Sequence, residues 1–199
     1  MEKRHRVFVA INLPEEMKRQ LASYAEKWPE LPAKWVRKDN LHITMEFLGN
    51  LTDEEIGEVC VAVKNVAEKH SCFSLNINKI LYGPPNPPSS KTSAGQGKMP
   101  KMVWAEGEKS QELSGLRADL EASLTEAVKF VPENRTFAPH ITLARISAME
   151  FRAIEPEERP EINEGLDLLF TVESIEVMES EMKREGPMYT VLESHQLNN

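Results

Sequence analysis

Two short stretches decide the fold: residues 41–45, Leu-His-Ile-Thr-Met, and residues 139–143, Pro-His-Ile-Thr-Leu. In both, a histidine and a threonine stand two residues apart, with apolar residues between and after them. Side chains alternate between the two faces of a β-strand, so the polar pair projects from one face and the apolar pair from the other. A His-Ile-Thr triplet is expected by chance about 0.01 times in this composition. The duplication therefore predicts two strands, each with a face for chemistry and a face for the core.

The segments around the two motifs follow one another in the same order. Residues 4–82 have the pattern strand, helix, His-x-Thr strand, helix, strand, and residues 101–195 repeat it. Residues 83–100, rich in Pro, Gly and Ser, separate the repeats as a linker or long loop. We therefore predict a single domain, residues 1–199, built from two repeats. Related repeats usually pack about a two-fold axis, which would place the two His-x-Thr faces opposite one another in a cleft.

Local signals define several elements. Thr52, with Glu55 three residues later, forms a capping box that starts an amphipathic helix reaching residue 69. Leucines at helical spacing predict a second long helix ending near residue 128, and residues 147–165 support a short or broken helix. Strands are expected over residues 4–13, 40–48, 72–82, 102–105, 136–145, 170–178 and 188–192.

Composition limits the classes of function. A chain of 199 residues with 40% hydrophobic content can bury a substantial core. No apolar run approaches the roughly 20 residues of a membrane span, and the start lacks the apolar core of a signal peptide. Cys60 and Cys72 have neither metal-ligand spacing nor the pattern of a disulfide framework. We therefore expect a cytoplasmic protein with reduced cysteines.

The acidity of the chain is regional. Residues 146–185 hold twelve acidic and four basic residues, which accounts for the whole net charge of −8. Such a chain does not present the wide basic face that grips a long duplex. The regional charge is compatible with a local cationic patch over one phosphate. The acidic stretch, residues 146–185, is expected to be solvated surface.

Two facing imidazoles suit acid–base chemistry at phosphorus. Each has an unperturbed pKa of about 6.5 and can act as acid or base near neutrality. The attacking and leaving oxygens lie on opposite sides of phosphorus, so one histidine can deprotonate water while the other protonates the departing oxygen. Thr44 and Thr142 can donate hydrogen bonds to the non-bridging oxygens. A strained 2',3'-cyclic phosphate fits this arrangement, which needs no metal.

Further residues are candidates for binding. Arg145 would suit a phosphate clamp, but strict alternation puts it on the face opposite His140, so it requires a bulge or the end of the strand. Phe8, Trp104 and Tyr189 could stack on a base, with core packing as the alternative for each.

Glu46 stands four residues after His42, so strict alternation puts it on the same face of the strand, where its carboxylate could bind a metal ion. The second copy of the motif has Ala144 at the matching position. Because only one copy carries the carboxylate, we expect no metal.

Flanking motifs complete a recognisable pattern. Together with the two His-Ile-Thr triplets, they make the chain similar to the two-histidine (2H) phosphoesterase superfamily, and within it to the RNA 2',3'-cyclic phosphodiesterases, also named 2'-5' RNA ligases. The resemblance covers nearly the whole chain and keeps the order of the family. The flanking motifs are Ala10-Ile11-Asn12-Leu13-Pro14, Trp35-Val36, Phe47-Leu48-Gly49, Val103-Trp104-Ala105 and Gly186-Pro187-Met188-Tyr189.

The resemblance implies a bilobal α+β fold, with two pseudo-two-fold-related lobes whose antiparallel sheets line a central cleft and whose helices lie outside. It implies hydrolysis of RNA or nucleotide 2',3'-cyclic phosphates to 2'-phosphomonoesters. We expect the protein to act as a monomer, without cofactor or metal. By family analogy His42 is the proton donor and His140 the acceptor, an assignment that the motifs themselves leave open. Thr44, Thr142 and Arg145 bind the substrate. Attack by a 5'-hydroxyl would give a 2'-5' RNA linkage.

Two departures and two alternatives accompany the resemblance. Lys101 stands where relatives commonly have arginine, and Glu106 where they more often have glycine. A binding module that holds a nucleotide or an RNA 2'-phosphate without turnover is the alternative from another class. A 2'-5' oligoadenylate or small cyclic-nucleotide phosphodiesterase is the alternative among enzymes. The intact histidines and threonines in both repeats favour an enzyme.

Overall fold

The computed structural model describes residues 3–84, 99–132, 137–184 and 186–199. Most of the segment predicted as a loop, residues 85–98, therefore lies outside the described residues. The helices are α1 (Glu15–Ser23), α2 (Asp53–Ala67), α3 (Gln111–Ala127) and α4 (Ala148–Ala153). The strands are β1 (His5–Asn12), β2 (Ala33–Trp35), β3 (His42–Leu51), β4 (Phe73–Gly83), β5 (Met102–Gly107), β6 (His140–Ile146), β7 (Asn163–Val172), β8 (Ser174–Lys183) and β9 (Gly186–Gln196).

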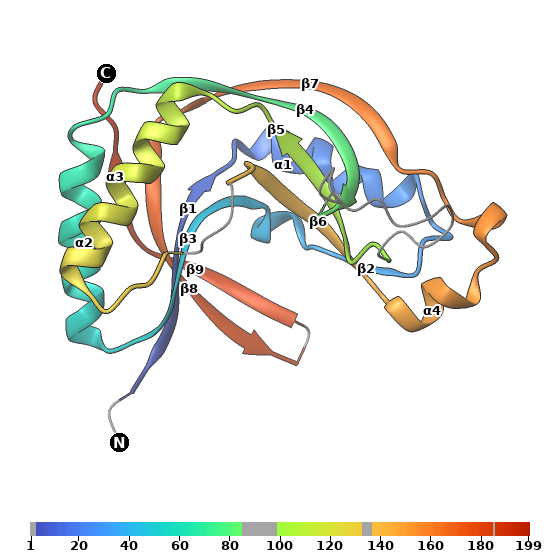
Figure 1. The fold of residues 1–199 in the computed structure, drawn as a ribbon, viewed down its shortest axis with the longest axis horizontal. Coiled ribbons are helices and arrows are strands. Elements are labelled where there is room, and N and C mark those ends of the chain that lie inside the picture. The colour runs from blue at the N-terminus through green and yellow to red at the C-terminus, as the bar shows by residue number, and fades with distance from the viewer. Residues whose placement is uncertain (1–2, 85–98, 133–136, 185) are drawn as a thin grey trace.

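The strands form one antiparallel sheet in the order β7-β4-β5-β6-β3-β1-β8-β9, with β2 beside β6 (Figure 1). The two His-x-Thr strands, β3 and β6, lie at its centre, flanked by β1 and β5. This symmetry confirms the predicted α+β fold with two related lobes. The lobes exchange strands between the sequence repeats, because β4 of the first repeat pairs with β5 and β8 of the second repeat pairs with β1.

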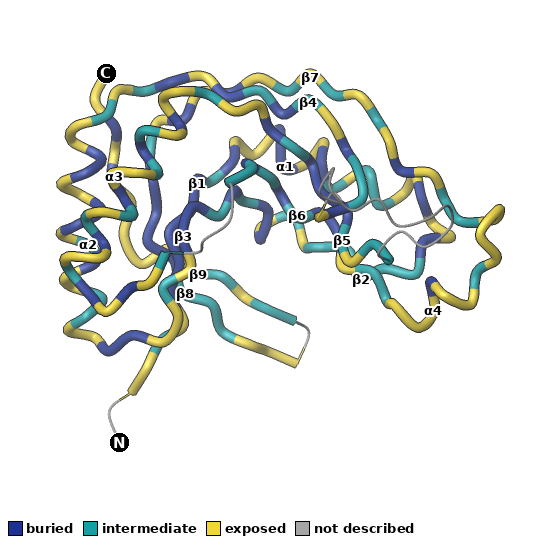
Figure 2. Tube along the Cα trace, in the orientation of Figure 1, coloured by how far each residue is buried: buried dark blue, intermediate teal, exposed yellow. Residues whose placement is uncertain are grey.

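The core lies between the sheet and the helices on its outer face. α2 and α3 lie side by side (Figure 1) and contribute Val59 and Val63 from one helix and Leu116 and Leu120 from the other. The inner strands and the first half of β8 are buried, whereas β9 and α4 are largely exposed (Figure 2). None of the helices in the described part of the chain is both long enough and apolar enough to cross a membrane.

The capping box predicted at the start of α2 is confirmed. Thr52 Oγ1 accepts a hydrogen bond from the backbone amide of Glu55, and the Glu55 carboxylate accepts one from the amide of Thr52. These two bonds satisfy amides that the first turn of a helix leaves without intrahelical partners.

Two assignments of strands from the sequence are corrected. Residues 170–178 were expected to form one strand, but β7 ends at Val172 and β8 begins at Ser174, and the two strands pair with β4 and β1 in different lobes. The chain changes lobe at Glu173 without a Gly or Pro to mark the turn. In addition, residues 33–35 form strand β2, where no strand was expected, because three residues are too few to show a period.

A buried ion pair joins α3 to β3 behind the sheet. Arg117 Nε donates to the Glu46 carboxylate at 2.7 Å, and the Glu46 side chain is 2% exposed. The sequence placed Glu46 on the face of His42 as a candidate metal ligand. This is wrong, because a bulge at Met45 turns Glu46 into the core. Burial raises the pKa of Glu46 to about 7, although the Arg117 guanidinium opposes that shift.

We expect Arg117→Met to lower the free energy of unfolding by about 3 kcal/mol, because it leaves a buried carboxyl group without its partner. The loss should grow as the pH rises above about 7, because Glu46 of the unchanged protein is then ionised and paired with Arg117, whereas in the variant the buried carboxyl group must hold its proton at increasing cost or ionise without a partner. Urea unfolding across this range measures both effects. The control is Arg19→Met, which breaks the exposed Arg19–Glu16 pair and should cost less than about 1 kcal/mol. Equal, pH-independent losses would contradict the prediction.

Candidate active site

The two His-x-Thr motifs meet at one point of the sheet, where Ile43 on β3 pairs with Ile141 on β6. In an antiparallel ladder this pairing sets His42 towards Thr142, and Thr44 towards His140. Both isoleucines are fully buried in the core. The histidines and threonines therefore project from the other face and surround a common centre.

The backbone fixes both imidazoles in the same way. Nδ1 of His42 lies 2.7 Å from the carbonyl oxygen of Asn40, and Nδ1 of His140 lies 2.8 Å from that of Ala138. A carbonyl only accepts, so Nδ1 carries the proton in each ring and Nε2 is left for chemistry. Thr44 Oγ1 lies 3.0 Å from Nε2 of His42 and donates to it in the free protein.

Each histidine lies against an aromatic residue of the neighbouring strand. The Phe8 and His42 ring centroids are 5.0 Å apart, and Trp104 stacks on His140 at 3.8 Å. Phe8 is 2% exposed and Trp104 8%, and Gly83 covers the indole so closely that a Cβ there would lie 2.2 Å from it. Both rings are buried, which favours the alternative of core packing over base stacking, and both rings support the imidazoles.

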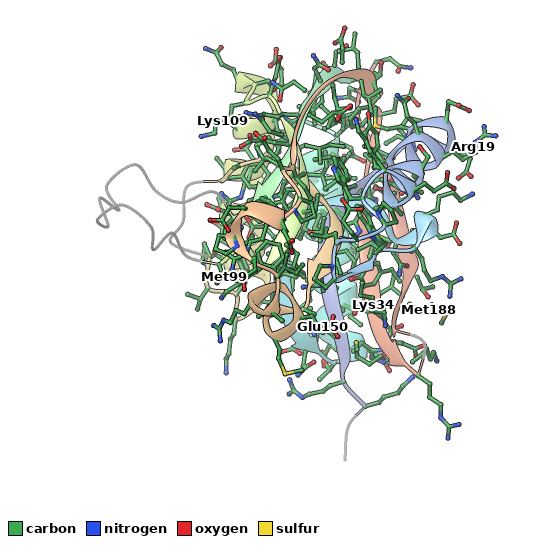
Figure 3. All side chains as sticks on the ribbon, turned by 90° about the vertical axis from the view of Figure 1, so that its right-hand side faces the viewer. Arg19, Lys34, Met99, Lys109, Glu150 and Met188 are labelled. Carbon is green, nitrogen blue, oxygen red and sulfur yellow. The ribbon has the colours of Figure 1, made fainter. Side chains whose placement is uncertain are left out.

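Tyr189 closes the side of the site next to His42. Its ring meets that of His42 edge-on at 5.1 Å. The start of β9 is held there because Asn40 Nδ2 donates to the carbonyl oxygen of Pro187 at 2.7 Å. Figure 3 shows Lys34 of β2 and Met188 of β9 on the same side of the molecule, and a Cβ at Gly186, where β9 begins, would lie 3.2 Å from Lys34 Nζ. Tyr189 therefore remains a candidate for contact with substrate.

Both His-x-Thr strands have a β-bulge at the residue that follows the threonine. The register between β1 and β3 shifts at Met45, and that between β5 and β6 shifts at Leu143. A bulge adds one residue, so the chain beyond it faces the opposite side from the one that strict alternation gives. Arg145 accordingly shares the face of His140, and it pairs with Met102, two residues before Trp104. The bulge that the sequence required for Arg145 is present.

Phe47 is the residue that sequence reasoning missed. It occupies in the first motif the position that Arg145 occupies in the second, and its ring lies 6.1 Å from that of Phe8 on the same face as His42. It is 56% exposed, so its ring is open to a ligand. The signal was available, because aligning the two repeats places Phe47 on Arg145.

Burial lowers the pKa of both histidines. The pKa of His42 falls to about 4, mainly through burial and further through the positive charge of Lys18 on α1. Burial also lowers the pKa of His140, but the carboxylate of Glu106 opposes the shift. At neutral pH the free site therefore offers neutral imidazoles with Nε2 lone pairs. Among the described residues, no three His, Cys, Asp or Glu side chains are grouped to hold a metal ion.

Comparison with known proteins agrees with this geometry. The family model described as LigT like Phosphoesterase matches residues 11–90 and 103–189. The RNA 2',3'-cyclic phosphodiesterase of Thermus thermophilus is 32% identical over 96% of this chain and 90% of its own length. That of Thermotoga maritima is 26% identical over 94% of this chain and 92% of its own length.

Solved structures match over the whole fold. A crystal structure of a Thermus thermophilus protein superposes with a TM-score of 0.78 at 28% identity and covers 98% of both chains. E. coli LigT complexed with 3'-AMP superposes with a TM-score of 0.73 at 25% identity, covering 99% of this chain and 100% of LigT. From the family model, which spans both His-x-Thr strands, and from these relatives, the chain belongs to the LigT-like phosphoesterase family, within the 2H phosphoesterases.

Proposed function

We propose that this protein hydrolyses terminal 2',3'-cyclic phosphates of RNA or nucleotides to 2'-phosphomonoesters. The observation that carries the proposal is the convergence of two His-x-Thr pairs around the Ile43–Ile141 contact. The names of the curated relatives, RNA 2',3'-cyclic phosphodiesterases, support the choice of substrate.

The reaction needs one proton acceptor and one donor on opposite sides of phosphorus. A water oxygen bonds to phosphorus as one imidazole Nε2 takes its proton, and the bond from phosphorus to the ribose O3' breaks as the other imidazole protonates that oxygen. The backbone bonds at Nδ1 hold both rings with Nε2 towards the reacting group. The product is a 2'-phosphomonoester with a free 3'-hydroxyl.

The remaining groups hold charge and substrate. Thr44 and Thr142 donate hydrogen bonds to non-bridging oxygens, where negative charge grows in the transition state. Arg145, on the same face, binds the phosphate through its guanidinium. The exposed ring of Phe47, with Tyr189 next to His42, offers the base a stacking surface.

The same site supports ligation when a 5'-hydroxyl takes the place of water. The attack then forms a 2'-5' phosphodiester, and no nucleotide cofactor is needed because the cyclic phosphate supplies the strained bond. Hydrolysis dominates in water because the competing nucleophile is the solvent.

A nucleoside 2',3'-cyclic phosphate and a short RNA ending in a cyclic phosphate should both give 2'-phosphomonoesters in excess chelator. His42→Ala and His140→Ala should each lower kcat by at least roughly 100-fold, because each removes a proton-transfer group. The control is His70→Ala, since His70 pairs with Asp119 outside the site and turnover should persist. Product identity is read by chromatography against both isomers. A 3'-phosphate, dependence on metal, or normal turnover in either site variant would contradict the proposal, and binding without turnover would indicate a binding module.

The pH profile of kcat/KM should be bell-shaped, with its acid limb below 6.5, the ordinary pKa of histidine. Burial lowers the pKa of the base, so the base stays neutral and active to lower pH. Activity falls only as the pH drops through that pKa. Activity falls again at high pH as the acid loses its proton. Initial rates at low substrate concentration measure the profile. An acid limb above 6.5 would contradict the buried site.

Phe47→Ala should raise KM for nucleotide substrates by at least about 5-fold with little change in kcat, because base stacking is worth about 1 kcal/mol or more. Steady-state kinetics with a purine cyclic phosphate measure the effect. Met182→Ala removes another exposed apolar side chain, on β8, and should leave KM unchanged. An unchanged KM in Phe47→Ala would remove this ring from the base site.

A further inference from the structure

Asn40, two residues before His42, contacts two parts of the site that belong to different strands. Its backbone carbonyl oxygen accepts the hydrogen bond from Nδ1 of His42 at 2.7 Å. Its side-chain Nδ2 donates to the carbonyl oxygen of Pro187, at the start of β9, also at 2.7 Å. Asn40 itself is buried. One residue therefore holds both the ring of His42 and the β8–β9 hairpin.

Tyr189 completes this set of contacts. It follows Pro187 by two residues, so both lie on one face of β9. Its ring meets that of His42 edge-on at 5.1 Å and that of Phe8 edge-on at 5.2 Å. The contacts therefore close a circuit, in which the bond from Asn40 to Pro187 fixes the position of Tyr189 beside the imidazole.

The hairpin end, residues 180–184 and 186–190, leaves the sheet. β8 pairs with β1 from Glu176 to Glu179, and in the described pairing its later residues bond only to β9. Figure 1 shows this end projecting away from β1, and Met182 on it is 72% exposed. An isolated two-stranded ribbon is at best marginally stable in water. The position of the hairpin end therefore depends on its contacts with the rest of the chain.

A second contact holds the hairpin end on the same side of the molecule. Gly186 has a φ of +128°, a conformation that favours glycine, and a Cβ there would come close to Nζ of Lys34 on β2. β2 pairs with β6 of the other lobe. The hairpin end therefore reaches from β8, beside β1, to β2, and it is fitted closely where it arrives.

The other lobe has no equivalent link. The residue two before His140 is Ala138, whose carbonyl oxygen lies 2.8 Å from Nδ1 of His140. The side chain of Ala138 is a methyl group, which donates no hydrogen bond. A backbone carbonyl is thus enough to hold an imidazole, and the amide of Asn40 has a separate role at the hairpin.

We propose that Asn40 is a positioning residue that fixes the hairpin end beside the site, and with it the contact between Tyr189 and the bound nucleotide. This inference rests on the proposed function for its substrate. The side chain of Asn40, acting through Tyr189, determines how tightly the nucleotide binds. The backbone of Asn40 orients His42 for chemistry. Loss of the amide should therefore raise KM and leave kcat nearly unchanged.

The first test follows amide hydrogen exchange of residues 188–190 by NMR in the free protein. Asn40→Ala should speed this exchange by about 5-fold, the effect of losing one hydrogen bond of ordinary strength. Asn40→Asp keeps the shape of the side chain but turns an oxygen towards the carbonyl of Pro187, so it should speed exchange at least as much. Exchange in α3 is the internal reference for general unfolding.

The control is Asn78→Ala, which removes a side-chain amide on β4 that donates to Glu108 outside the site. It should leave exchange at residues 188–190 unchanged. Unchanged exchange in Asn40→Ala, normal exchange in Asn40→Asp, or equal acceleration in α3 would overturn the inference, because Asn40 would then fill space or support the fold in general.

Steady-state kinetics with a nucleoside 2',3'-cyclic phosphate test the link to Tyr189. Asn40→Ala should raise KM by about 5-fold and change kcat by less than about 2-fold. In a Tyr189→Ala background the same substitution should have almost no further effect, because its effect passes through that ring. Gly186→Ala strains the hairpin end without changing Asn40 or His42, and it should raise KM in the same Tyr189-dependent way.

A fall in kcat at constant KM, or additive effects of Asn40→Ala and Tyr189→Ala, would overturn the inference. The exchange measurements use no substrate. If no cyclic phosphate were turned over, the proposed function would fail, while exchange at residues 188–190 would still show whether Asn40 holds the hairpin end.

Discussion

The contact between Ile43 and Ile141 is the constraint from which the site follows. It joins the two His-x-Thr strands at the centre of the sheet, on the face that packs against the core. Because alternate residues face opposite sides, burying this pair forces the neighbouring histidines and threonines to the other face around one centre. The hydrophobic effect that orders the core therefore also assembles the site.

The fold is symmetric, but its chemistry is not. Each motif strand carries a bulge at the same position, and each bulge returns one side chain to the site: Phe47 in one lobe and Arg145 in the other. One lobe thus supplies an aromatic surface and the other a cation, which suits a ligand with a base at one end and a phosphate at the other. Under the proposed function, this duplicated frame would bind its substrate in one direction.

Sequence patterns predicted what depends on local alternation or on repetition. The two motif strands, the capped helix from Asp53 and the α+β class follow from period and capping chemistry, and the structure confirms them. The placement of Glu46 was wrong and that of Phe47 was missed, because a bulge changes alternation without a residue type to announce it. The aromatic candidates Phe8 and Trp104 are buried by contacts across strands that are distant in sequence. The exchange of strands between lobes likewise depends on long-range pairing that composition does not encode.

The most direct measurement of the central claim is a crystal structure of the protein with a nucleoside 2'-phosphate, the expected product. The account predicts that the phosphate lies between Nε2 of His42 and Nε2 of His140, within hydrogen-bond distance of both, with the hydroxyls of Thr44 and Thr142 on its oxygens. A phosphate bound away from this centre, or held by one lobe with the other imidazole turned from it, would contradict the account.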